Sequence, residues 1–130
     1  MVKYIADWIA QNGDEVAQSA AFTIALLPSE PAAMTETLSR AQSEYGRMGA
    51  LLADAESFVL LAHAAATMEA WDKYAERSAD ERKIMAKADP DYLQALRLRD
   101  NLKHIVQALH QKAFACMSAA KVFHATGMNQ

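Results

Sequence analysis

The chain has 130 residues and a mass of 14.3 kDa, the size of one domain with a core of its own. Hydrophobic residues make up 52% and charged residues 22%, which excludes a disordered chain and one dominated by membrane spans. The net charge of −3 argues against a protein that coats nucleic acid over its whole surface. Only 4 Gly and 3 Pro interrupt residues that favour helices, so we expect an all-α protein.

One cysteine, Cys116, excludes an internal disulfide and suits a reducing compartment. The N-terminal segment "MVKYIADWIAQNGDE" has early acidic residues and no long apolar core, so it does not have the pattern of a signal peptide. Both features predict a cytoplasmic protein.

Two short helices are expected in residues 1–28. The first covers residues 2–11 and ends at Asn12-Gly13, and the second runs from Asp14 to Leu27. The second ends in "AAFTIALL", which is apolar on all sides and predicts burial on several sides. The segment "PSEP" then ends this region.

A long helical pattern starts near Ala32 and can continue to about Ser78. A short helix over 79–88 follows, and a last helix covers 90–126 after Asp89-Pro90. Each long helix has an apolar seam with alternating three- and four-residue spacing. The seams are Leu38, Ala41, Tyr45, Met48, Leu52, Ala55, Val59, Ala62 and Ala66, and Leu98, Leu102, Ile105, Leu109, Ala113, Cys116, Ala120 and Phe123.

These patterns predict a single domain over 1–130. It is a helical bundle built on a long antiparallel helical hairpin over 32–126, with the N-terminal helices packed against it. Helices of this length require either an elongated hairpin or a bend. Gly46 and Gly49 are the weak points for a bend, and they could equally let another helix approach closely.

The most apolar stretch, residues 51–71, has more apolar width than one partner helix covers. Asp54, Glu56 and His63 interrupt it, so we expect no membrane span. A second stripe is expected to pack against the N-terminal helices and consists of Leu51, Phe58, Ala65 and Met68. Leu60, Ala64 and Trp71 lie on a different side, and they predict the interface of a homodimer.

No catalytic, cofactor-binding or metal-binding signature is present in the sequence. His104 and His110 are six residues apart and point in different directions on one helix, so they do not predict a metal site. Glu69-x-x-Asp72 is half of the metal-binding signature of all-helical nucleotide pyrophosphohydrolases, but the upstream Glu-x-x-Glu is missing. We therefore expect a protein that is not an enzyme.

Two polar features have both a structural and a functional interpretation. Glu56, His63 and Thr67 form a polar strip, which we expect to be a buried contact that fixes the register of the bundle rather than a ligand site. The second is a cationic stripe on the last helix. We expect it to be a solvated flank of the helix. The alternative is that it binds an anionic partner, either nucleic acid or an acidic protein. This stripe consists of Arg97, Arg99, Lys103, His110 and Lys121.

Three segments occur in the order "SRAQSEYGRMGALLADAESFVLLAHAAATMEAW", "ERSADERKIMAKADPDY" and "LRLRDNLKHIVQALHQKAFACMSAAKV". In this order, from about residue 38 to 124, the chain resembles a group of small helical phage proteins encoded in early or recombination gene modules. The resemblance implies a phage or prophage origin and an accessory role without catalytic residues. We expect binding to another phage or host protein, in DNA replication or recombination. The alternatives are an inhibitor of a host defence complex, as anti-CRISPR proteins are, and an enzyme with an unrecognised site.

Overall fold

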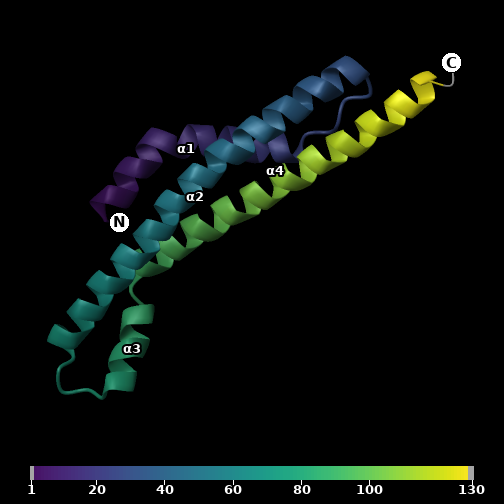
Figure 1. Ribbon diagram of the computed structural model, residues 1–130. Coiled ribbons are helices and arrows are strands. Elements are labelled where there is room, and N and C mark those ends of the chain that lie inside the picture. Colours follow the sequence, from purple (N-terminus) through teal and green to yellow (C-terminus); the bar gives the residue numbers. More distant parts are fainter. Residues whose placement is uncertain (1, 129–130) are drawn as a thin grey trace.

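The computed structural model describes the backbone of residues 2–128 and the side chains of residues 2–123. It contains α1 (Lys3–Ile24), α2 (Pro31–Lys73), α3 (Ala79–Lys87) and α4 (Pro90–Met128). The long helices α2 and α4 pack antiparallel along most of their length, and α3 lies at the end where the chain turns from one to the other (Figure 1). The expected all-α fold with a long antiparallel hairpin is therefore confirmed, in its elongated form.

The core of the hairpin repeats every seven residues on both helices. On α2 the positions Ala41, Met48, Ala55 and Ala62 are buried, and on α4 the positions Ala95, Leu102, Leu109 and Cys116 have no exposed surface. A seven-residue repeat keeps the same face of each helix against its partner. The predicted seams are thus the core, except that Tyr45 lies at its edge and is 43% exposed.

The ends of the helices follow local signals. Pro31 occupies the first turn of α2. The Ser78 hydroxyl accepts a hydrogen bond from the main-chain N–H of Glu81 at the start of α3. At the start of α4, the Asp89 carboxylate accepts one from the main-chain N–H of Tyr92. The α2 helix ends at Lys73, a few residues before the expected end near Ser78.

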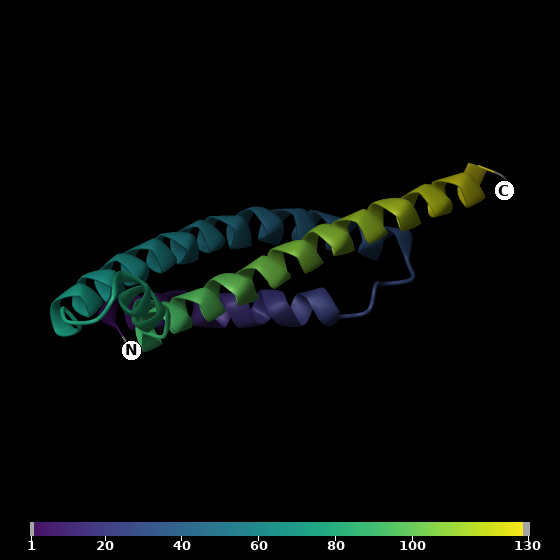
Figure 2. The same cartoon turned by 90° about the horizontal axis from the view of Figure 1, so that it is seen from below.

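Neither glycine of α2 interrupts the helix or lies at a close contact with another element. The helix is continuous through Gly46 and Gly49, and nothing lies within 4 Å of a Cβ built on either. Close approach of another helix is therefore not their role in this fold. Figure 2 shows α2 as one arched helix beside α4.

The expectation of two short N-terminal helices is wrong, because α1 is one helix through Asn12 and Gly13. The Asn12 side chain donates a hydrogen bond to the main-chain oxygen of Trp8, one turn earlier, so it stays within the helix instead of ending it. Its oxygen accepts a second hydrogen bond, from Arg47 of α2. Gly13 has no left-handed conformation, so its freedom is not used to make a turn.

Polar and apolar contacts hold α1 against one face of the hairpin. The indole Nε1 of Trp8 donates to the Asp54 carboxylate at 3.0 Å. The guanidinium of Arg47 pairs with the Glu15 carboxylate at 2.8 Å. Phe22 is buried near the end of α1. The predicted burial of "AAFTIALL" on several sides is wrong beyond this residue, since Ile24 and Leu26 are exposed.

Candidate interaction surfaces

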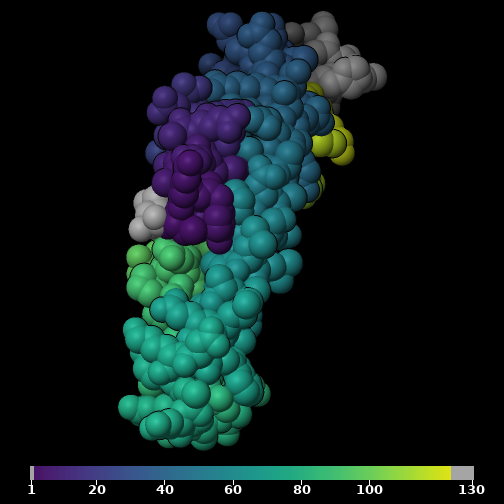
Figure 3. Space-filling view, turned by 90° about the vertical axis from the view of Figure 1, so that its left-hand side faces the viewer, coloured from purple at the N-terminus to yellow at the C-terminus, as the bar shows by residue number. Residues whose placement is uncertain are grey.

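Five exposed apolar residues of α2 form what we call the outer stripe: Leu60, Leu61, Ala64, Met68 and Trp71. Their spacing of one, three, four and three residues places them on one side of the helix, away from the buried seam. Leu60 is 73% and Met68 69% exposed. Figure 3 shows that α2 continues beyond the N-terminal end of α1, where Ile5 packs beside Ala62, so Ala64, Met68 and Trp71 lie past this contact.

The second expected stripe divides at the point where α1 begins. Leu51 is buried, and Phe58 packs against Tyr4 and Trp8, with ring centroids 5.2 and 6.2 Å apart. Ala65 and Met68 were expected to be covered by the N-terminal helices and are instead exposed. The cover comes from the first turns of α1, where Ile5 packs beside Ala62, before Ala65 and Met68 are reached.

At the far end of the outer stripe, Trp71 is held by α3. The guanidinium carbon of Arg82 lies 3.7 Å from the centroid of the Trp71 ring. One part of the indole is therefore covered by a cation, and the side chain remains 48% exposed. This contact fixes the orientation of the largest residue in the stripe.

The polar strip does not form the buried contact that was expected. Glu56 and His63 are exposed, and the Thr67 hydroxyl donates to the main-chain oxygen of His63 within its own helix. The His63 ring instead packs against Tyr92 of α4, with centroids 5.1 Å apart. The strip is at the surface because it lies beside the seam on the face of the hairpin opposite α1.

A second aromatic pair lies on the same face. Tyr45 and His110 have ring centroids 5.7 Å apart. The step from Tyr45 to His63 along α2 equals the step back from His110 to Tyr92 along α4, so the two pairs share one register. This open face is the side of the α2–α4 hairpin that no helix of the described chain covers.

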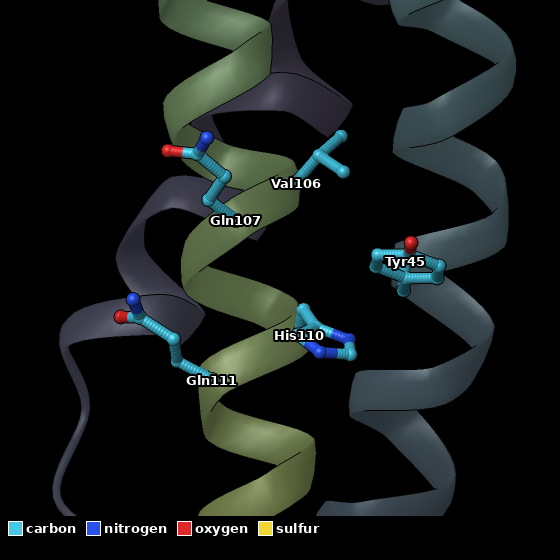
Figure 4. A pocket seen from close by; sticks show the side chains of 5 residues that line it. All are labelled: Tyr45, Val106, Gln107, His110 and Gln111. Atoms are coloured by element: carbon cyan, nitrogen blue, oxygen red, sulfur yellow. The ribbon is translucent and has the colours of Figure 1, made fainter.

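The open face is hollowed around Tyr45 and His110. A hollow of about 330 Å³ is lined by Gln42, Tyr45, His110, Ala113, Phe114 and Met117. We call it the open groove. A neighbouring hollow shares Tyr45 and His110 and reaches Val106. Figure 4 shows Tyr45 reaching from α2, and Val106 and His110 from α4, into the space between the helices.

The cationic stripe is accessible along α4. Arg97, Lys103, His110 and Lys121 are exposed, whereas Arg99 is half-buried and donates to the Asp100 carboxylate at 3.0 Å. These five residues extend over about 36 Å of helix, so the structure does not gather them into one pocket.

Sequence reasoning missed Lys112, which is buried against the end of α1. Its Nζ donates to the main-chain oxygens of Phe22 and Ala25 and lies 4.0 Å from the Phe22 ring centroid. Burial lowers the Lys112 pKa from its usual 10.5. Cys116, one turn further, is buried in the seam as expected, and burial raises the pKa of its thiol. The only available signal was that Lys112 lies between two seam residues, Leu109 and Cys116.

Among the residues that the structure describes, no three His, Cys, Asp or Glu side chains are grouped to hold a metal ion. By length and composition, α2 is the one described helix that could cross a membrane. One 18-residue window of it has a mean hydropathy of 1.3, with 22% of the window buried. Comparison of the chain with protein-family models, with curated proteins and with solved structures finds no match.

Proposed function

We propose that this chain is a non-enzymatic binding protein that works as a two-fold homodimer, with the outer stripe of α2 as the contact between protomers. The observation that carries the proposal is the exposure of Leu60, Leu61, Met68 and Trp71 on a helix whose opposite side already forms the core. A contiguous apolar stripe on a surface helix usually marks an interface.

The order of side-chain sizes in the stripe favours a second copy as the occupant. A small residue, Ala64, lies at its centre, with Leu60 and Leu61 on one side and Met68 and Trp71 on the other. In a two-fold contact each residue meets the symmetry-related surface. Two antiparallel α2 helices crossing at Ala64 approach closely at the alanines, and Leu60 of each copy lies opposite Met68 of the other.

The dimer would serve another protein rather than a membrane, in the cytoplasm. The phage-like arrangement of segments supports an accessory role in phage DNA replication or recombination. A second candidate, inhibition of a host defence complex, is favoured by the charge of residues 1–60, which hold three basic residues against eight acidic. Salt-dependent binding of single-stranded DNA would support the first role, and co-purification with a host nuclease complex the second.

Sedimentation equilibrium at micromolar concentration tests the dimer. The wild-type protein is expected at twice the chain mass of 14.3 kDa. Leu60→Lys places a charge in the apolar contact and is expected to sediment as a monomer. Because Leu60 is exposed in the protomer, this variant should keep its helical circular dichroism.

Ile24→Lys is the matched control, since Ile24 is 85% exposed and lies at the end of α1, away from the outer stripe. It is expected to remain dimeric. If Leu60→Lys aggregates, Ala64→Glu places a charge of the opposite sign at the centre of the contact. A wild-type mass of one chain, or equal dimer formation by all variants, would contradict the proposal.

A further inference from the structure

The open groove is an unfilled position in a helical bundle. The hairpin of α2 and α4 has two long faces, and α1 fills one with Ile5, Trp8 and Phe22. On the other face Tyr45 is 43%, Phe114 67% and Met117 44% exposed. The face covered by α1 shows that a groove between these two helices accepts an amphipathic helix, and the open groove has the same two walls.

The apolar content of the open groove suits a helix of this kind. Phe114 and Met117 provide an aromatic ring and a flexible thioether at its α4 wall, while Tyr45 provides the α2 wall. An amphipathic helix binds such a groove through side chains spaced three and four residues apart. Methionine adapts its shape to different partner side chains.

The charges beside the groove favour a partner with a negatively charged surface. Lys103 is exposed and His110 lies in the groove wall, both on the open side of α4, and Lys121 is exposed further along the helix. After Asp91, Asp100 is the only carboxylate side chain in the sequence, against five lysines and arginines. On α2, the polar strip places one exposed carboxylate, Glu56, on the same face. Acidic residues on a bound helix would therefore meet a positive potential along the α4 wall of the groove.

We propose that the open groove binds an acidic amphipathic helix of another protein, with its apolar side against Phe114 and Met117 and its carboxylates near Lys103. This identifies the kind of partner that the binding protein takes. It uses the face between α2 and α4, whereas self-association uses the outer stripe. The apolar groove favours a protein helix over nucleic acid, because no phosphate backbone would use Phe114 and Met117.

Fluorescence anisotropy with synthetic peptides tests this. Two labelled amphipathic peptides of about 18 residues have the same apolar face of leucine and alanine. At the polar positions, one peptide carries glutamate and the other carries lysine. The acidic peptide is expected to bind about tenfold more tightly than the basic one, less so in high salt. Lys103→Glu should weaken acidic-peptide binding about tenfold, and Phe114→Ser should weaken the binding of the acidic peptide without changing its salt dependence.

Lys83→Glu on α3 is the matched control for charge, and Leu26→Ser is the control for loss of an exposed apolar side chain. Both should bind as the wild type does. Leu60→Lys should also bind as the wild type does, so failure of the dimer proposal is separable from failure of this one.

Four results would overturn the assignment of the groove. They are equal binding of the two peptides, absence of binding by either, identical behaviour of Lys103→Glu and Lys83→Glu, and binding of a labelled oligothymidylate in place of the acidic peptide. The last result would assign the cationic stripe to nucleic acid instead.

Discussion

Lys112 of α4 donates a hydrogen bond from its Nζ to the main-chain oxygen of Phe22 in the last turn of α1. The same Nζ donates to the main-chain oxygen of Ala25, at 3.0 Å. Carbonyl groups at the end of a helix have no partner within the helix and carry partial negative charge. A lysine from a distant part of the chain thus caps the C-terminal end of α1 and ties it to the hairpin.

Replacing Lys112 by methionine is expected to lower the free energy of unfolding by about 2 kcal/mol. The substitution keeps the long side chain but leaves the main-chain oxygens of Phe22 and Ala25 without this donor. Urea denaturation followed by circular dichroism measures the change. Lys121→Met, at an exposed position of the same helix, should change stability little. A loss no larger than that of the control would show that Lys112 does not hold α1.

The stabilising role of Lys112 should also depend on pH in a defined direction. Burial lowers its pKa from 10.5, so between the lowered pKa and 10.5 the unfolded chain binds more protons than the folded chain. The stability of the wild type relative to Lys112→Met should therefore increase as the pH rises through this window. Denaturation curves at several alkaline pH values measure the difference, and a decrease with rising pH would contradict the burial of the amine.

Tyr4 should act in the opposite sense above its usual pKa of 10.0. Burial, followed by the negative charges of Asp91 and Asp89, raises the Tyr4 pKa. The unfolded chain then loses the phenol proton first, and stability falls as the pH rises above 10.0. Tyr4→Phe is expected to remove this part of the fall. An unchanged alkaline profile in that variant would contradict it.

Truncation of the core should separate the fully buried positions from the partly buried ones. Leu102→Ala and Leu109→Ala are expected to cost about 2–5 kcal/mol, because neither residue has exposed surface. Leu52→Ala and Val59→Ala should cost less, since both are only partly buried. Leu26→Ala, at a residue 96% exposed, is the control. Equal costs at all four seam positions would show that the seam is packed differently.

The helix boundaries could largely be predicted from the sequence because local chemistry sets them. Pro31, Ser78 and Asp89-Pro90 act within one turn of the chain, and each lies at or beside a helix start in the structure. The Asn12-Gly13 pair was misinterpreted because its prediction also rested on local chemistry alone. In the structure the Asn12 side chain bonds to the main chain of Trp8 and also to Arg47, a partner 35 residues away that local spacing does not reveal.

The surfaces could be predicted only in part. Leu60, Ala64 and Trp71 were separated from the seam by helical geometry alone, and they are exposed. Met68 was assigned to a covered stripe, because helical spacing does not reveal where α1 stops. The position of the open groove depends on which face of the hairpin α1 packs against. No local sequence pattern predicts that face.

Cysteine cross-linking at the centre of the outer stripe tests the dimer most directly. Ala64→Cys is expected to form a disulfide between protomers under mild oxidation, since the two-fold contact brings the symmetry-related positions together. Ser57→Cys should not do so, because antiparallel helices crossing at Ala64 separate the two residues 57 by about 21 Å. The wild type, with only the buried Cys116, should stay uncross-linked. Failure of Ala64→Cys to cross-link, or equal cross-linking at both positions, would contradict an antiparallel dimer through α2.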